Sequence, residues 1–261
     1  MSKKEFYIGW QGKMPENTRK FLKRFLWIAM ALIVVMAIGL VFFEKPFKKH
    51  FFNFGQLDQI TGVYYDEPYP FILTDYNAES GQAKTVLLVG SGKFGAKGIM
   101  DKIQDKSGAL SGIRITLEGT LISGDGKTLL ELTNGTDALK EMLNVELIET
   151  PAPPAPENVT LQGEILDPKC YFGVMKPGEG KIHNIFAIMC ISGGIPPFFM
   201  ASEGDSQDER YRYYLLLDQK GNPCNKEILP FVGEPISLQA ISTKMLDWDV
   251  LFVNIKDIKT Q

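Results

Sequence analysis

The longest apolar run of the chain lies near its N-terminus. Residues 26–43, LWIAMALIVVMAIGLVFF, contain no charged side chain. A helix of this length would span about 27 Å, close to the hydrocarbon thickness of a bilayer. Buried helices of soluble proteins rarely run so far without a polar residue, so we expect a transmembrane helix over residues 25–44.

After this run the pattern changes to short apolar stretches separated by Gly, Pro, Asp and Asn. Such stretches, rich in β-branched and aromatic residues, are typical of β-strands. They cover residues 60–65, 71–74, 84–89, 113–122, 127–132, 159–166, 211–217, 235–242 and 250–255. One further stretch, residues 136–148, has apolar side chains at helical spacing and predicts a helix.

The two β-rich halves of the chain echo each other. Residues 62–71 parallel residues 163–172, and residues 112–119 parallel residues 233–240. The offset grows from 101 to 121 residues between these pairs, so the second copy contains about 20 extra residues in its middle. A small barrel of OB type that occurs twice would explain the echo.

The expected fold class is therefore mainly β, with one N-terminal transmembrane helix followed by two tandem small OB-like β-barrel modules. Residues 1–24 form a basic N-terminal segment, residues 45–150 the first module and residues 158–261 the second. Between the modules, residues 151–157 are rich in proline and predict an extended linker, because proline fixes φ and removes a hydrogen-bond donor.

Charge also divides the chain. The first 50 residues contain ten Lys or Arg against three Glu, whereas the other residues sum to −10. An acidic bulk excludes a nucleic-acid binder that is held by its overall charge. Seven basic residues precede the apolar run and three follow it, which places the N-terminus in the cytoplasm. We expect an uncleaved signal anchor in the inner or plasma membrane, single-pass, with a periplasmic or otherwise extracytoplasmic C-terminal domain.

A glycine-rich motif follows the strand predicted at residues 84–89. Residues 90–95 read GSGKFG and match the GxGxxG pattern of dinucleotide-binding loops. That pattern requires a helix directly after the loop and a parallel strand beyond it. We expect residues 96–98 to continue the loop and the neighbouring strands to be antiparallel, so a nucleotide is not an expected ligand.

The candidate chemistry gathers around Cys170, His183 and Cys190. His183 and Cys190 are seven residues apart, so on a helix over residues 181–191 they share one face. Three interpretations stay open: a Cys170–Cys190 disulfide or plain structural thiols, a metal or haem-type site that uses all three residues, and a nucleophilic cysteine beside His183. We expect residues 173–197 to be an insertion that the two cysteines hold against the second barrel.

At these residues the chain resembles an uncharacterised family of bacterial membrane-anchored exported proteins, with the pattern GExxDxxCY followed by GxxHxxCAxxCIxxGxP. The matching positions are Gly163, Glu164, Asp167, Cys170, Tyr171, Gly180, His183, Ala187, Cys190, Ile191, Gly194 and Pro196. Phe186 stands where the family pattern has another cysteine. If the family binds a metal through all its Cys and His, this chain has lost one ligand. The resemblance implies an association with membrane redox complexes, and it implies no reaction.

Two functions follow as expectations. The first is a membrane-anchored exported binding or scaffold protein, with a protein partner in a membrane redox complex as the resemblance implies. The alternative is a metal- or haem-handling protein that uses Cys170, His183 and Cys190, whose cofactor would be a copper, zinc or haem-type centre. The sequence contains no GxSxG, HExxH or P-loop motif and only two histidines, which is more typical of a non-enzymatic protein.

Overall fold

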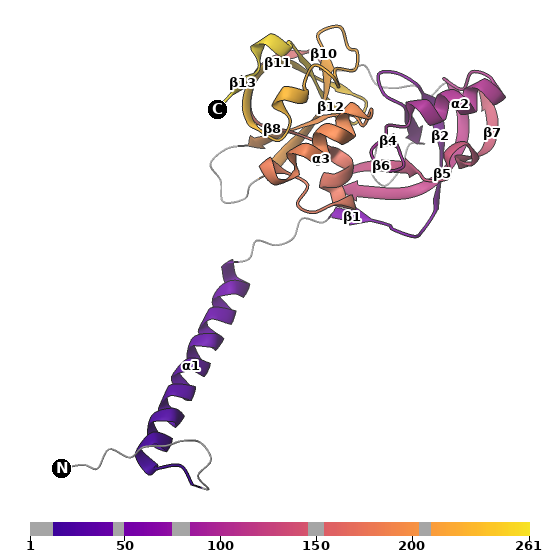
Figure 1. Cartoon of the computed structure of the whole chain (residues 1–261). Helices are drawn as coiled ribbons and strands as arrows, with labels where there is room; N and C mark the ends of the chain where they lie inside the picture. Colours follow the sequence, from indigo (N-terminus) through magenta and orange to yellow (C-terminus); the bar gives the residue numbers. More distant parts are fainter. Residues whose placement is uncertain (1–12, 44–49, 75–83, 146–153, 204–209) are drawn as a thin grey trace. The chain divides into compact units, whose positions relative to one another are not determined.

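The computed structural model describes residues 13–43, 50–74, 84–145, 154–203 and 210–261, which belong to two compact units (Figure 1). The first unit, residues 1–48, contains α1 (Glu16–Phe43). Among the described residues, α1 is the one helix that is long and apolar enough to cross a membrane. The predicted apolar helix is thus confirmed, and it begins earlier than expected, at Glu16, whose carboxylate lies 3.1 Å from the Lys20 ammonium.

The second unit, residues 49–261, contains two closed five-stranded β-barrels. In spatial order the first barrel consists of β2 (Asp58–Tyr65), β3 (Phe71–Thr74), β4 (Thr85–Gly90), β6 (Lys127–Leu132) and β5 (Ile113–Gly124). Neighbouring strands are antiparallel except β4 and β6, and β5 closes the barrel by pairing with β2. The connection from β4 to β5 contains α2 (Lys97–Ser107), while β1 (His50–Phe52) and β7 (Leu139–Val145) both pair with β5.

The second barrel repeats this topology. In the same spatial order it consists of β8 (Glu157–Leu166), β9 (Phe198–Glu203), β10 (Arg210–Asp218), β12 (Trp248–Val253) and β11 (Pro235–Met245). Its parallel pair is β10 with β12, β11 closes onto β8, and β13 (Lys259–Thr260) adds to β11. A parallel pairing of the third and fifth strands in both barrels is an OB-type arrangement, which confirms the predicted fold class.

Residues 62–65 and 112–119 occupy positions equivalent to residues 163–166 and 233–240, whereas the predicted parallel of residues 66–71 with residues 167–172 is wrong, because Phe71 begins β3 and Phe172 lies in the insertion. Gly62 of β2 lies opposite Ile115 of β5, and Gly163 of β8 lies opposite Ile236 of β11. A Cβ atom on Gly62 would collide with the carbonyl oxygen of Leu73, and one on Gly163 would collide with the equivalent carbonyl on β9. The first strand of each barrel therefore needs glycine at the point where the next strand approaches it most closely.

Several elements differ from expectation, among them the short strands β1 and β13, which were not predicted. The helix predicted over residues 136–148 is wrong, because Gly135–Ala138 form a short 3₁₀ turn (η1) and β7 follows. β2 pairs with one edge of β5, and β7 pairs with the other edge. This pairing with a distant strand outweighs the helix that the spacing of a few leucines would favour. Residues 96–98 were expected as loop, but Ala96 is the N-cap of α2 and the helix itself begins at Lys97. Its buried side chains Met100 and Ile103 are too few to show a period. β9 was not predicted, and residues 146–153 lie outside the described residues.

The extra residues of the second copy lie between its first two strands. Residues 66–70 connect β2 to β3, whereas residues 167–197 connect β8 to β9. This insertion contains a wide helical turn, η2 (Cys170–Val174), and α3 (Gly180–Ser192), so the helix expected over residues 181–191 is confirmed.

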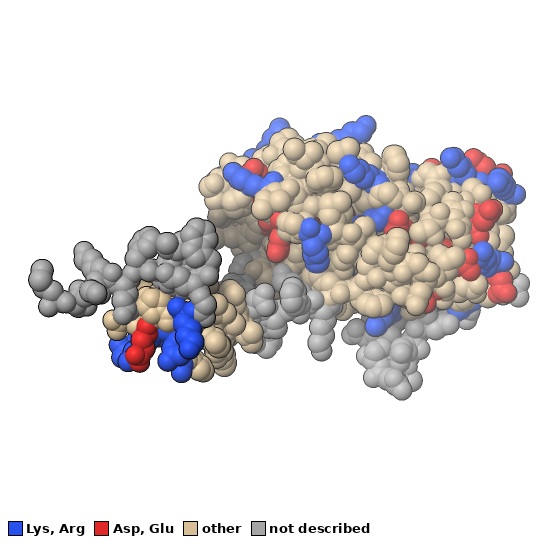
Figure 2. All heavy atoms as spheres, turned by 60° about the horizontal axis from the view of Figure 1, so that its bottom comes forward, with Lys and Arg blue, Asp and Glu red and all other residues tan. Residues whose placement is uncertain are grey.

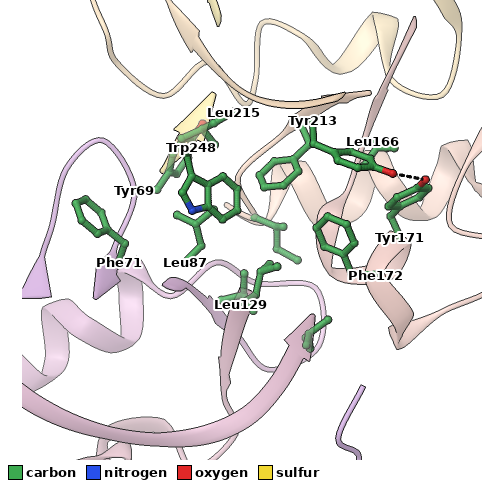
Figure 3. Packing of buried hydrophobic residues seen from close by; sticks show 14 of the residues in the cluster. Tyr69, Phe71, Leu87, Leu129, Leu166, Tyr171, Phe172, Tyr213, Leu215 and Trp248 are labelled. Atoms are coloured by element: carbon green, nitrogen blue, oxygen red, sulfur yellow. Dashed lines mark hydrogen bonds between the residues drawn. The ribbon is translucent and has the colours of Figure 1, made fainter. Parts of the chain in front are cut away.

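The two barrels share one hydrophobic cluster, which Figure 3 shows from close by. Leu87 and Leu129 of the first barrel meet Trp248, Phe198 and Leu215 of the second in this cluster. The indole Nε1 of Trp248 donates a hydrogen bond to the carbonyl oxygen of Thr85 at 3.2 Å. The Lys127 ammonium lies 4.9 Å from the centre of the same indole ring. The linker predicted from proline content therefore joins barrels that touch each other.

A buried lysine adds a polar connection between the insertion and the first barrel. Lys169 is 1% exposed, and its ammonium donates to the carbonyl oxygens of Gly90 and Gly92 at 2.8 and 2.7 Å. The third partner is the Glu131 carboxylate at 3.0 Å. All three ammonium protons have an acceptor, which is the condition under which a buried charge is tolerated.

We expect Trp248→Ala to destabilise both barrels together by about 3–5 kcal/mol, because it empties the centre of their shared cluster. Urea unfolding of the full chain in detergent, followed by circular dichroism, measures this change. Ile241→Ala is the control, because Ile241 is 43% exposed and its truncation should change stability by less than about 1 kcal/mol. Two separate unfolding transitions in the Trp248→Ala variant would contradict a shared core.

We expect Lys169→Met to cost about 3–5 kcal/mol, because it leaves the Glu131 carboxylate buried without its cation. Adding Glu131→Gln to that variant should recover part of the loss, and a double-mutant cycle measures the coupling. Lys181→Met is the matched control, since Lys181 pairs with Glu234 at 3.3 Å on the surface and should contribute at most about 1 kcal/mol. Equal losses for the two lysine variants would refute the structural role of Lys169.

Candidate functional site

The insertion of the second barrel begins with a turn that fixes Asp167 and Cys170 close together. Asp167 follows directly after β8, and its Oδ1 accepts a hydrogen bond from the backbone N–H of Lys169 at 2.9 Å. Its backbone carbonyl accepts from the N–H of Tyr171 at 3.0 Å, which begins the helical turn η2. Asp167 and Cys170 are three residues apart in this turn, so their side chains project to the same side.

α3 supplies the other half of the site. His183, Ala187, Cys190 and Ile191 are its buried residues, which is the i, i+4, i+7, i+8 spacing of one helix face. The helix begins at Gly180, whose N–H donates to the Glu164 carboxylate at 2.6 Å. It ends at Gly193, whose N–H bonds back to the carbonyls of the last turn. The predicted placement of His183 and Cys190 on one face is confirmed.

The structure brings three possible metal ligands into contact distance. The ligand atoms of Asp167, Cys170 and His183 all lie within 4.8 Å of one another, and all three residues are buried. The thiol of Cys190, which is also buried, lies near enough to the Cys170 thiol to raise its pKa. Two of the three predicted ligands thus lie in the group of three, and Cys190 lies beside it.

Two polar atoms of this group have no hydrogen-bond partner among the described residues. They are Oδ2 of Asp167 and Nε2 of His183, on side chains that are 0% and 2% exposed. A buried polar atom without a partner costs about 1–3 kcal/mol, so native structures rarely retain one without a purpose. A carboxylate oxygen and an imidazole nitrogen beside a thiol are all electron-pair donors, and a cation would satisfy them together.

The electrostatics of the site follow from its burial. The neighbouring Cys190 thiol, followed by burial and by the charge and side-chain interaction of Asp167, raises the pKa of the Cys170 thiol. Burial lowers the pKa of His183, although the charge of Asp167 acts in the opposite direction. The thiol is therefore protonated and the imidazole neutral at pH 7, which disfavours a reactive thiolate in the metal-free protein. A metal ion would reverse this for Cys170 by displacing its proton.

The size of the group favours a single ion over a haem. Three donor atoms that converge within 4.8 Å leave room for one ion between them, whereas a haem needs a flat cavity many times larger. Phe186 stacks on the His183 ring with 6.0 Å between centroids. It covers one side of the imidazole and takes no part in the donor group.

The disulfide interpretation stays a prediction. Cys170 and Cys190 are free thiols in the structure, and their contact places them where oxidation could join them. Cys224, the third cysteine, is buried in a separate cluster within the second barrel. Burial raises the pKa of its thiol to about 12, so it behaves as an apolar core residue.

Asp167 was not among the ligands predicted from the sequence. It was named only as part of the family pattern, because a lone aspartate after a strand is most often a turn residue. The signal that could have found it is its spacing of three residues from Cys170, which equals one helical turn. Its unpaired Oδ2 is visible only in three dimensions.

The glycines of the GSGKFG motif have a structural use. The N–H of Gly95 donates to the carbonyl oxygen of Gly193 at 3.0 Å, which ties the loop to the C-terminal end of α3. A Cβ on Gly95 would collide with the backbone of Gly194, and one on Gly193 would collide with the carbonyl oxygen of Lys93. Although α2 follows this loop, the next strand, β5, is antiparallel to its neighbours, so the βαβ unit of a dinucleotide site is not formed.

Comparison with known proteins does not extend these observations. The resemblance to an exported family therefore stays a prediction, and the candidate site depends on its own geometry. No protein-family model matches the chain, and no curated protein matches it in sequence.

Proposed function

We propose that this chain is a membrane-anchored metal-binding protein that holds one zinc ion in the insertion of its second barrel. The observation that carries the proposal is the pair of unpartnered buried atoms, Asp167 Oδ2 and His183 Nε2, beside the Cys170 thiol. Carboxylate oxygen, imidazole nitrogen and thiolate sulfur are all preferred ligands of Zn²⁺.

The donor set favours zinc over copper. Copper(I) prefers sulfur and imidazole alone, whereas Zn²⁺ accepts carboxylate oxygen, imidazole nitrogen and thiolate sulfur in one tetrahedral shell. Asp167, Cys170 and His183 would supply three ligands, and the neighbouring Cys190 thiol is the candidate for the fourth. A divalent cation also offsets the buried negative charge of Asp167 and of the ionised thiols.

Membrane anchoring is the second part of the proposal. α1 is long and apolar enough to span a bilayer, and the basic residues before it favour a cytoplasmic N-terminus. The barrels would then lie outside the cytoplasm, where a thiol pair is exposed to oxidation and where a bound metal protects it. The scaffold role in a membrane redox complex stays a prediction, and metal binding is compatible with it.

We expect the full chain, purified in detergent under reducing conditions, to contain about one Zn²⁺ per molecule by elemental analysis. Asp167→Asn and His183→Ala should lose most of the metal, since each removes one donor. Cys224→Ala is the matched control, because Cys224 is buried outside the site and its loss should leave metal content unchanged. Substitution by Co²⁺ should give the visible bands of tetrahedral cobalt with thiolate ligands. Metal-free protein with a Cys170–Cys190 disulfide, shown by mass spectrometry, would refute the proposal.

Removal of the metal should lower the melting temperature of the barrel unit. A ligand present at 100 times its dissociation constant stabilises the folded state by about 2.7 kcal/mol, so a chelator should remove stability of that order. A reductant alone should have no effect, because no covalent bond holds the metal-bound thiols. Circular dichroism melts with reductant and then with chelator measure both effects. A melting temperature that falls with reductant and ignores chelator would instead identify a structural disulfide.

A further inference from the structure

α3 has apolar side chains on two of its faces. One face is buried and carries His183 and Cys190. The other is exposed, and we call it the outer stripe of α3. Its members follow the i, i+3, i+4, i+7 spacing of a single helix face and are Ile182, Ile185, Phe186 and Met189. Ile182 and Ile185 are 83% and 71% exposed, so the outer stripe is an apolar surface that the described residues leave uncovered.

Such a stripe is unusual on a water-soluble surface. A helix at the surface of a globular protein normally presents polar residues outward, and a helix that is apolar all round is normally buried or in contact with lipid. A contiguous exposed apolar patch marks an interaction surface more often than scattered single residues do.

Basic side chains accompany the outer stripe. The Lys93 ammonium lies 5.0 Å from the ring centre of Phe186 and 3.1 Å from the sulfur of Met189. Lys181 directly precedes the stripe and is highly exposed, with Glu234 3.3 Å away. Apolar side chains that point outward beside lysines are typical of helices that lie in the interface of an anionic bilayer.

The position of α3 in the chain indicates what covers the stripe. The segment that leads into α3 rests on β1, because the ammonium of Lys176 contacts His50 at 3.1 Å. β1 is the first strand after α1, and only residues 44–49 connect them. A chain of this length reaches at most about 25 Å, so the start of the barrel unit cannot move farther than that from the end of α1.

The surface around β1 agrees with this location. Phe51 and Phe54 are exposed large apolar residues at the start of the barrel unit. Figure 2 shows the side of the unit on which β1 lies in Figure 1: charged residues of both signs gather at the end formed by α2 and β7, and much of the remaining surface is uncharged. Aromatic residues close to a membrane anchor are typical of the bilayer interface.

We propose that the outer stripe of α3 docks on the surface of an anionic lipid bilayer, with Lys93 and Lys181 directed to lipid phosphates. The inference rests on the proposed anchoring of α1 in that bilayer and is independent of the proposed metal. Docking would place the helix that carries His183 and Cys190 against the headgroups, with its metal-facing side turned inward.

The test uses the full chain in nanodiscs of anionic lipid, with an environment-sensitive NBD fluorophore on a single introduced cysteine. Ile185→Cys reports the outer stripe, Ile241→Cys is the matched exposed isoleucine on β11, and Val34→Cys reports insertion of α1. The native cysteines are buried, and the parent protein is the control for labelling. We expect blue-shifted emission at positions 185 and 34, with most of it lost when the lipids carry doxyl quenchers, and neither effect at position 241.

Further variants make the result decisive. Ile182→Glu or Lys93→Glu in the Ile185→Cys background should reduce quenching, whereas Ile241→Glu should not, and zinc content should stay unchanged in all three. A quenched label at position 34 with an unquenched label at position 185 would overturn docking and leave anchoring intact. A blue-shifted label at position 185 that doxyl lipids do not quench would show a protein partner or a second copy on the stripe, and would overturn the lipid proposal. No quenching at position 34 would refute anchoring, and docking with it.

Discussion

The buried ammonium of Lys169 is the interaction on which the arrangement of the second unit depends. It lies in the segment between Asp167 and Cys170, and all its acceptors belong to the first barrel. A buried charge of this kind tolerates little displacement, because any shift leaves an ion without a partner in a medium of low dielectric constant. The turn that carries the candidate ligands Asp167 and Cys170 is therefore held in place by residues of the first barrel, although it belongs to the second.

The insertion can keep polar atoms without hydrogen-bond partners because the rest of the structure holds it in place. The ends of the insertion continue into β8 and β9, and Lys169 fixes its first turn. The hydrogen bond between Gly95 and Gly193 fixes the end of α3. A segment fixed at so many points can hold Asp167 Oδ2 and His183 Nε2 in place without hydrogen bonds of their own. Preorganisation of this kind is what a selective metal site requires, because the ligands do not have to be ordered when the ion arrives.

Much of the fold could be predicted from local pattern, and the failures have physical causes. The apolar helix and most strands have strong periodic signals, and the echo between Gly62 and Gly163 is visible because both strands need glycine at the same point. β7 was predicted as a helix because its stabilising partner, β5, is distant in the chain. Cys170, His183 and Cys190 could be named from residue type, but Asp167 could not, since its role depends on which of its oxygens has no partner among the described residues.

The position of the insertion has a consequence for how the chain folds during synthesis. Every acceptor of Lys169 precedes it in the sequence, and so do Leu87 and Leu129, against which Trp248 lies. A ribosome releases the chain from its N-terminus, and domains tend to fold as units in that order. Every residue of the first barrel that the insertion contacts through Lys169 is therefore synthesised before residues 167–197, so these contacts are available to the insertion before β9 to β12 have been made.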